Sequence, residues 1–246
     1  MRGLAGVMDF FAEKDGDDEA RIALRAKDLS SPWKYLELAQ FCQAHGRADE
    51  ALRRAEEGLW IFEDARPDAR LLFLAADLLI ERGRPQDAES HLRRAFEKAP
   101  SMEIYARLKD VGGDAARDRA LDVLSTHVAD AMKTRWNFPA DLLIRVLLRE
   151  SLFDEAWTAL GKYGASSGLQ ESLARSSEAT HPRQALQVYV DRIESLVEGG
   201  GNGAYAEAAE LVARSAALRD GAAQTHYVLS IKQRYGRRRN FIKLLD

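Results

Sequence analysis

The chain has 246 residues, of which 46% are hydrophobic and 30% charged, so it holds enough apolar material for a core without a covalent staple. Its formal net charge is −3 and its pI about 6.0, which argues against a general nucleic-acid binder. The single cysteine, Cys42, excludes a disulfide within the chain and a cysteine-based zinc site, and it favours a reducing, cytoplasmic location.

Residues 1–30 are expected to form an N-terminal cap. Within "DFFAEKDGDDEARIALRAKDL" (Asp9–Leu29), the pattern predicts an acidic turn followed by one capping helix. Met1–Val7 is too short and too weakly apolar for a signal peptide.

A helix pair is predicted next. In "SSPWKYLELAQFCQAHGR", Ser31 is expected to cap the first helix, Pro32 suits its first turn and Gly46 ends it. A second helix follows at once over Ala48–Phe62, with Trp60 among its expected core positions.

The pair recurs along the chain. "GRADEALRRAEEGL" begins at Gly46, and "GRPQDAESHLRRAF" begins at Gly83, 37 residues later. An alanine near the start of each second helix lets the two helices approach closely, and its spacings are 37, 32, 36, 29 and 23 residues. These alanines are Ala51, Ala88, Ala120, Ala156, Ala185 and Ala208. Two-helix repeats of this length are typical of an α-solenoid.

We therefore predict an all-α fold, a tetratricopeptide-like right-handed solenoid of about six antiparallel helix pairs over residues 31–232. The second unit comes nearest to the tetratricopeptide pattern, with Ala88, Leu92, Ala95 and Pro100 at its small, large, small and proline positions. The predicted units are Ser31–Phe62, Pro67–Ala99, Ser101–Met132, Pro139–Tyr163, Leu169–Glu198 and Asn202–Lys232. Residues 233–246 are expected to be the basic end of the last helix.

One candidate binding surface follows from the repeat. First helices of tetratricopeptide units line a concave groove that can hold a peptide. The matching positions are Trp33, Leu36, Gln40 and Gln43 in the first unit, with Arg70, Phe73, Asp77 and Glu81 in the second. The alternative is that these residues pack on neighbouring units, and helical periodicity does not separate the two.

The chain end carries a second candidate. Residues 232–246 hold six basic side chains and one acidic side chain, which leaves 30 basic and 38 acidic groups elsewhere. The cations proposed to contact phosphates or an acidic partner are Arg234, Arg237, Arg238, Arg239 and Lys243. The alternative is structural: the cations suit a helix end while Phe241, Leu244 and Leu245 dock on the last repeat.

No motif predicts catalysis, a metal or a cofactor. The five histidines include no i, i+4 pair, and Cys42 lies on an apolar helix face where burial is expected. "GGGNGA" (Gly199–Ala204) follows a helix rather than a strand, so it is expected to be a loop and not a dinucleotide site. The most apolar segment, Leu142–Phe153, is interrupted by charges, which predicts no membrane partner.

Several stretches together resemble the C-terminal helical region of bacterial SWIM zinc finger family proteins, over about Asp28 to Asp246. They are "KDLSSPWKYLELAQFCQAHGRADEALRRAEEGLWIF", "ERGRPQDAESHLRRAFEKAPSMEIYARLK", "THPRQALQVYVDRIESLVEGGGNGAYAEAAELVARSAAL" and "YGRRRNFIKLLD". In that family an upstream C-x-C…C-x-H finger binds zinc and is associated with DNA or protein binding. Cys42 stands alone, so the family's zinc site matches no residue of this sequence.

The expected function is therefore a non-enzymatic scaffold for protein–protein interaction, whose partners are another protein and the family's finger module. The alternative is an accessory nucleic-acid-binding module that acts through the basic segment at the chain end.

Overall fold

The computed structural model describes residues 3–134 and 139–245, and every regular element in these ranges is a helix. Met1, Arg2 and Asp246, which belong to the predicted end segments, lie outside them. The α-helices are α1 (Gly3–Lys14), α2 (Asp18–Arg25), α3 (Pro32–Ala44), α4 (Ala48–Ile61), α5 (Ala69–Glu81), α6 (Pro85–Lys98), α7 (Met102–Ala131), α8 (Asp141–Arg149), α9 (Phe153–Tyr163), α10 (Ser167–Ser176), α11 (Pro182–Gly199), α12 (Asn202–Ser215), α13 (Gly221–Arg234) and α14 (Arg239–Ile242). Two short 3₁₀ helices cover Met132–Thr134 and Ala216–Leu218. The all-α prediction is confirmed for the described residues.

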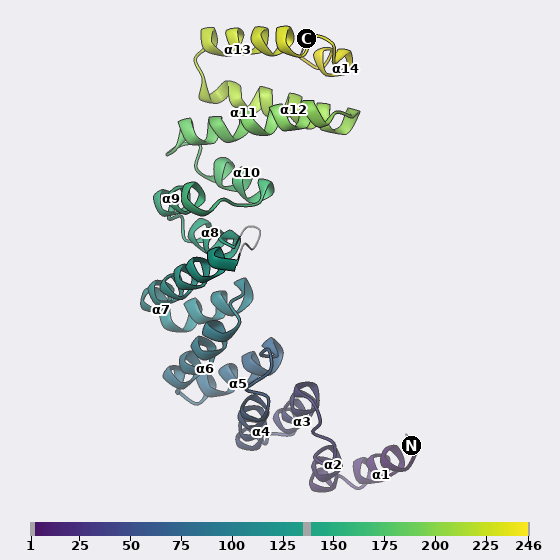
Figure 1. Ribbon diagram of the computed structural model, residues 1–246. Coiled ribbons are helices and arrows are strands. Elements are labelled where there is room, and N and C mark those ends of the chain that lie inside the picture. Colours follow the sequence, from purple (N-terminus) through teal and green to yellow (C-terminus); the bar gives the residue numbers. More distant parts are fainter. Residues whose placement is uncertain (1–2, 135–138, 246) are drawn as a thin grey trace. The chain divides into compact units, whose positions relative to one another are not determined.

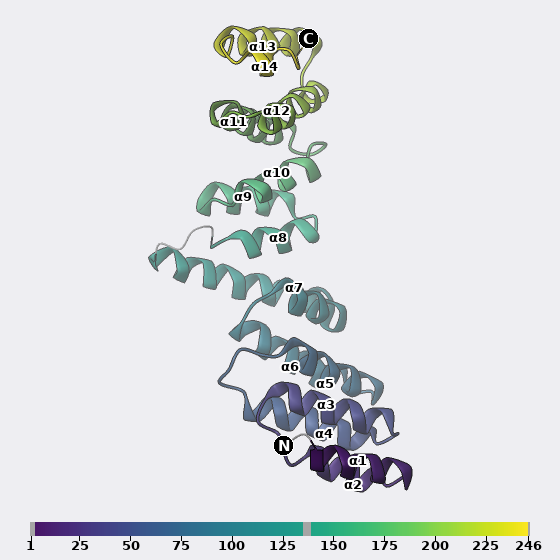
Figure 2. The same cartoon turned by 90° about the vertical axis from the view of Figure 1, so that its right-hand side faces the viewer.

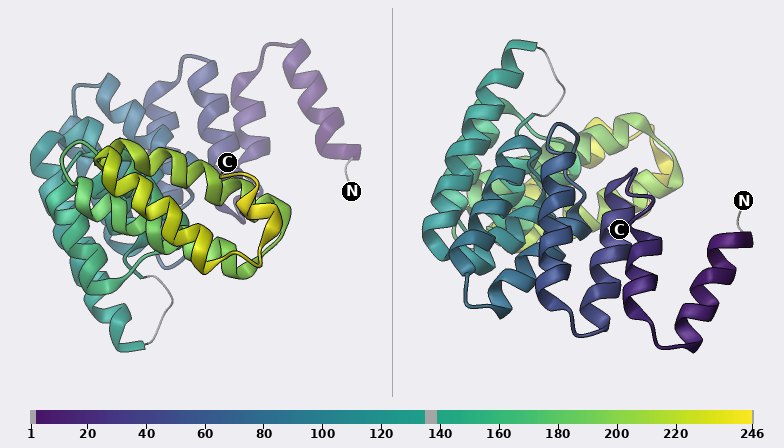
Figure 3. Two further views of the ribbon diagram at one scale, coloured as in Figure 1. Left: turned by 90° about the horizontal axis from the view of Figure 1, so that it is seen from above. Right: turned by 90° about the horizontal axis from the view of Figure 1, so that it is seen from below.

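The chain forms two compact units, residues 1–126 and residues 127–246. In the first unit each helix from α1 to α6 packs against the next as an antiparallel neighbour, as Figure 1 and the right panel of Figure 3 show. In the second unit, α8 packs on α9, α10 on α11 and α11 on α12 (Figure 2). The helix pairs predicted between Ser31 and Ala99 match α3–α4 and α5–α6.

The same tight turn joins the helices of three pairs. Gly46, Gly83 and Ser151 each adopt a left-handed backbone, with φ of 72°, 70° and 58°. In each turn the residue that follows donates its N–H to a carbonyl five residues back at 2.9 Å, as Arg47 does to Cys42. This is the Schellman motif, which satisfies carbonyls left open at a helix end and favours glycine at the left-handed position. The two stretches that begin with Gly-Arg, at Gly46 and Gly83, therefore each start at a turn between two paired helices.

The third predicted unit, Ser101–Met132, corresponds to α7, and Gly113 interrupts this helix. Its φ of 60° and ψ of −150° are accessible almost only to glycine, so two helical segments meet there. Ile104, Tyr105 and Leu108 are buried on the first segment. Ala120 and Leu124 are buried on the second.

All six marker alanines are buried, with at most 1% of their surface exposed. The prediction that each lies at a close helix–helix contact is therefore consistent with the structure. One assignment is wrong: Ala208 lies in α12, the first helix of the predicted unit Asn202–Lys232, rather than in its second helix. The short spacing of 23 residues between Ala185 and Ala208 is the reason, because α11 and α12 are consecutive helices that pair with each other.

The N-terminal segment differs from the prediction of one helix after an acidic turn. Two helices, α1 and α2, flank the acidic turn, in which Gly16 has a φ of 67°. Asp17 caps α2 by accepting from the Ala20 N–H at 2.9 Å. The expected side-chain cap at Ser31 is wrong, because its side chain accepts no hydrogen bond from α3. Its carbonyl instead accepts from the backbone N–H groups of Lys34 and Tyr35.

The C-terminal segment also differs, because it is not a continuation of the last helix. Helix α13 ends at Arg234, and after a turn through Gly236 the chain forms the separate helix α14. Helix α14 packs on α12 (Figure 2). Phe241 causes this reversal: its side chain is fully buried in the core of the second unit, beside the Tyr205 ring with centroids 5.8 Å apart.

Candidate functional site

Two of the first-helix residues predicted to form a groove, Trp33 and Arg70, contact each other. The Arg70 guanidinium lies over the Trp33 ring, 4.7 Å from its centroid, and Arg70 also pairs with Asp68 at 2.9 Å. Trp33 keeps 43% of its surface exposed, whereas Leu36 is buried at 2%. Leu36 is therefore a core residue and not part of a binding surface.

The same arrangement occurs one helix pair later. Arg107 of α7 lies over the Phe73 ring at 5.6 Å and forms an ion pair with Asp77. An aromatic side chain on one first helix is thus covered by an arginine from the next, at both steps. This favours the alternative that these residues hold neighbouring units together.

The remaining groove candidates are not drawn into these contacts. Gln40 and Glu81 are exposed and Gln43 is half-buried. Within residues 3–134, none of the three makes a side-chain hydrogen bond with the two aromatic–arginine pairs. The structure therefore brings together only part of the predicted set: Trp33 with Arg70, and Phe73 and Asp77 with Arg107.

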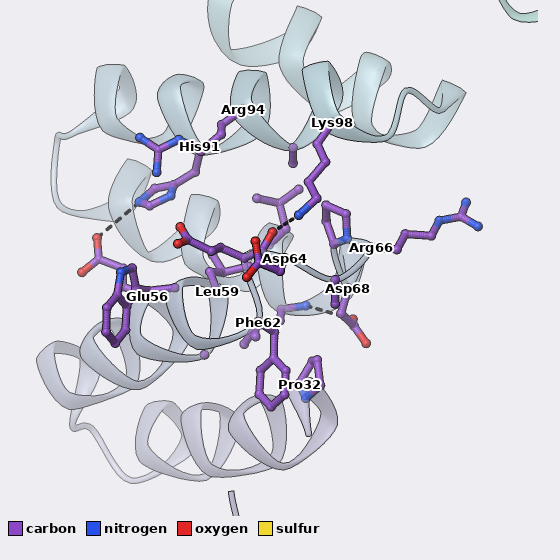
Figure 4. Close-up of a pocket in the computed structure, with 18 residues that line it drawn as sticks. Pro32, Glu56, Leu59, Phe62, Asp64, Arg66, Asp68, His91, Arg94 and Lys98 are labelled. Atoms are coloured by element: carbon purple, nitrogen blue, oxygen red, sulfur yellow. Dashed lines mark hydrogen bonds and ion pairs between the residues drawn. The ribbon is translucent and has the colours of Figure 1, made fainter. Parts of the chain in front are cut away.

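A different surface of the first unit is hollowed. A groove of about 520 Å³ lies between the last turns of α4, the loop 62–68, the start of α5 and one face of α6 (Figure 4). Its apolar lining comes from Pro32, Leu59, Trp60, Phe62, Pro67, Leu71, Leu72 and Ala95. Its charged and titratable lining comes from Glu56, Glu63, Asp64, Arg66, Asp68, His91, Arg94 and Lys98.

Small residues shape this groove. Gly58 packs so closely on α3 that a Cβ placed there would stand 2.7 Å from the Tyr35 Cβ. Leu71 and Leu72 line the groove but are each only 1% exposed, and Ala95 of α6 lines it with 7% of its surface exposed. Trp60, by contrast, is 70% exposed at the rim, so its predicted packing role is wrong.

Some charges in the groove already have partners. The His91 Nε2 lies 3.5 Å from a Glu56 carboxylate oxygen, and the Lys98 ammonium donates to the Glu63 backbone carbonyl. Asp68 caps α5 by accepting from the backbone N–H groups of Arg70 and Leu71 at 3.0 and 3.3 Å. Hydrogen bonding by the Arg70 side chain, against some burial, lowers the pKa of the Asp68 carboxyl. These partners fix the groove walls in place.

The basic segment at the chain end separates into two groups. Arg234 forms an ion pair with Glu194 of α11, so its charge already has a partner within the second unit. Arg237, Arg238, Arg239 and Lys243 are exposed and form no ion pair among the described residues. The Arg238 guanidinium donates to the Glu198 carbonyl at 3.3 Å, which ties the turn to the end of α11. Of the apolar residues expected to dock, Phe241 is buried and Leu245 partly so, but Leu244 is 52% exposed.

Sequence reasoning missed the carboxylate partners of the histidines, because these partners lie on other helices. The His181 Nε2 stands 2.7 Å from Asp154, and its Nδ1 stands 2.9 Å from the Thr180 hydroxyl. His45 lies 3.6 Å from Asp18. Among the described residues, no group of three or more His, Cys, Asp or Glu side chains is arranged to hold a metal ion. Cys42 is fully buried, and this burial raises the pKa of its thiol.

A buried tyrosine joins α11, α12 and the turn 177–180 of the second unit. The Tyr189 hydroxyl of α11 donates to Glu178 at 2.5 Å, and the Arg214 Nε of α12 donates to the same carboxylate oxygen at 2.6 Å. Burial and the hydrogen bond to Glu178 raise the pKa of Tyr189 to about 12. The sequence offers no signal for this cluster, since its members lie 11 to 36 residues apart.

No family model and no curated protein matches this chain. In the part of the chain that the structure describes, none of the helices combines the length and apolar character needed to cross a membrane.

Proposed function

We propose that the chain is a non-enzymatic helical-repeat scaffold that binds proteins or peptides, built as a tetratricopeptide-like, right-handed solenoid of about six helix pairs. The observation that carries the proposal is the groove of about 520 Å³, with its half-buried Leu59 and Phe62 and its exposed Trp60. Binding pockets typically enclose about 300–1,000 Å³ and combine an apolar lining with a few polar groups. Exposed tryptophans beside such hollows are frequent anchors of interfaces.

The local repeat geometry supports this architecture. A buried alanine marks each predicted unit, and a Schellman turn with a left-handed residue recurs at Gly46, Gly83 and Ser151. Each two-helix unit has an apolar face that a neighbour must cover, which is the physical basis of repeat stacking. The aromatic–arginine contacts Trp33–Arg70 and Phe73–Arg107 join successive first helices in the same way.

We also propose a relation to the C-terminal helical region of SWIM zinc finger family proteins. Its support is the ordered series of matching stretches from about Asp28 to Asp246. Cys42 is alone and buried, so zinc binding in such a protein would fall to the finger module. The partners proposed for this chain are that module and a further protein, in the cytoplasm.

A peptide selection tests the scaffold function. A random-peptide phage library is selected on the immobilised full chain, and retained peptides are measured by fluorescence polarisation. We expect specific peptides whose affinity falls about tenfold or more in Trp60→Ala, because the exposed indole supplies contact area. Trp33→Ala is the matched control, since Arg70 already covers that ring. A library that yields no retained peptide contradicts the scaffold function.

A specific observation favours a second candidate function, accessory nucleic-acid binding. Arg237, Arg238, Arg239 and Lys243 stand exposed without ion-pair partners among the described residues, while buried Phe241 anchors the segment that carries them. Phosphate contacts need cations that are free of competing carboxylates and held in one place.

Fluorescence anisotropy with labelled single- and double-stranded oligonucleotides at low salt tests this candidate. Binding is expected to weaken as salt rises and to be lost when Arg237, Arg238 and Arg239 are all changed to alanine. Arg234→Ala is the control, because this side chain already pairs with Glu194. Absence of binding at low salt rules the candidate out.

A further inference from the structure

The two walls of the groove carry opposite charge. His91, Arg94 and Lys98 follow one another on α6 at i, i+3 and i+7, so they share one helix face. The facing loop contributes the carboxylates of Glu63 and Asp64. Figure 4 shows the Lys98 side chain reaching from α6 toward this loop.

Several of these charges are unsatisfied within the chain. Among the described residues, Arg94 has no ion-pair partner, and neither do Glu63 and Asp64. The Lys98 ammonium donates to one backbone carbonyl, which leaves two of its three donors for another acceptor. Arg66, the other cation of the loop, points away from the groove (Figure 4). The groove thus presents a cationic side and an anionic side.

An apolar floor lies between the two sides. Leu71 and Leu72 are buried beneath it, and its accessible part comes from the half-buried Leu59 and Phe62 and from Trp60 at the rim. A ligand without an apolar group would leave this floor in water, whereas a uniformly charged ligand would meet repulsion from one wall. Complementarity therefore requires an apolar group between charges of opposite sign.

We propose that the groove binds a peptide segment of a partner protein that carries one apolar side chain between an acidic and a basic side chain. The apolar side chain lies on Leu59 and Phe62 against Trp60. The acidic side chain faces Arg94 and Lys98 of α6, and the basic one faces the 62–68 loop. This inference rests on the proposed scaffold function and adds the chemistry and orientation of the partner.

A biased phage library tests the proposal. The displayed peptides have a fixed central leucine, and their flanking positions are limited to Ser, Glu and Lys. On the wild-type full chain we expect enrichment of Glu on one side and Lys on the other. On the double variant Asp64→Lys with Arg94→Glu, we expect no preferred order of the two charges, because Lys98 and Glu63 keep their signs and each wall then carries charges of both signs.

Fluorescence polarisation with an enriched peptide gives the magnitude. Arg94→Glu is expected to weaken binding about five- to tenfold, the size of an exposed ion pair lost and replaced by repulsion. Arg93→Glu is the matched control, because this neighbouring arginine is also exposed but lies outside the groove. Circular dichroism confirms that each variant keeps its helix content.

The outcomes separate this inference from the function on which it rests. Retained peptides without an opposite-charge pattern, or equal losses for Arg94→Glu and Arg93→Glu, overturn the groove assignment and leave the scaffold function standing. Failure of both the biased and the random library to yield any peptide overturns the two together.

Discussion

The Arg70 guanidinium lies over the Trp33 ring at 4.7 Å and joins the start of α5 to the start of α3. Both residues belong to the predicted concave surface, and the contact between them connects α3 with α5. Asp68 holds Arg70 from the other side while it caps α5, so the aromatic ring, the cation and the cap form one connected group. A cation held over an aromatic face is attracted by the ring quadrupole.

A double-mutant cycle measures this contact. Because the two side chains interact directly, Trp33→Ala and Arg70→Ala together should lower the free energy of unfolding by less than the sum of the single changes. Chemical denaturation of the four proteins gives the coupling. Arg66→Ala, in the loop beside α5, is the control and should combine additively with Trp33→Ala. Additivity for Trp33 and Arg70 as well would show that the contact adds no stability.

Ser151 offers a test of the repeated turn. Its left-handed backbone, with φ of 58°, costs a residue with a side chain about 1–2 kcal/mol. Glycine avoids this cost, but its greater conformational entropy in the unfolded chain cancels part of the gain in stability. Ser151→Gly should therefore raise the free energy of unfolding by up to about 1 kcal/mol. The reciprocal change Gly83→Ser, in the equivalent turn, should lower it. Urea denaturation checks both signs, and equal effects of one sign would contradict the shared turn geometry.

The small-residue contacts predict a position-specific response in α12. Ala208 is fully buried where α12 meets α11, so Ala208→Leu should cost about 1–3 kcal/mol through overpacking. Ala206 lies on the exposed face of the same helix, and Ala206→Leu should stay within about 0.5 kcal/mol of the wild type. Thermal and urea unfolding compare the two. Similar losses of stability in both variants would show that the contact between α11 and α12 does not require a small side chain at position 208.

Local chemistry explains which parts of the fold could be predicted. The start of α3 at Pro32 and its end before Gly46 could be predicted, because each residue restricts or permits particular backbone angles by itself. The six marker alanines could be recognised from the sequence as sites where helices approach closely, because the size of a side chain is known from the residue alone. All six are buried in the structure. Their assignment to first and second helices failed at Ala208, where the pairing of α11 with α12 decides the partner.

The candidate sites depend on relations between distant residues, and there prediction was weaker. Trp60 has the periodicity of a core residue, yet it stands 70% exposed at the rim of the groove. The groove itself arises from the loop 62–68 and the α6 face, which spacing along the chain does not bring together. Likewise, the reversal at the chain end depends on burial of Phe241, while the adjacent arginines dominate the sequence pattern.

The Tyr189 cluster predicts a defined change in alkaline stability. The folded pKa of Tyr189, about 12, lies above its ordinary value of 10.0. The contribution of this shift to the free energy of unfolding is therefore complete below pH 10 and is lost as the pH rises through about 12. Tyr189→Phe should therefore lose less stability than the wild type between pH 10 and 12, because phenylalanine does not ionise. Urea denaturation across this range checks it. Glu178→Gln should shift the tyrosinate absorbance to lower pH, and an unchanged titration would contradict the role of Glu178.

Phe241 is expected to hold the C-terminal segment on the second unit. Its ring is fully buried beside Tyr205, so Phe241→Ala should cost about 3–5 kcal/mol of stability in that unit. Leu244→Ala is the matched control, because that side chain is 52% exposed and should change stability by less than about 0.5 kcal/mol. Hydrogen exchange over residues 237–245 should rise sharply in Phe241→Ala alone. If exchange there is already fast in the wild type, the segment is not docked, and the exposed arginines lose the anchor on which the nucleic-acid candidate depends.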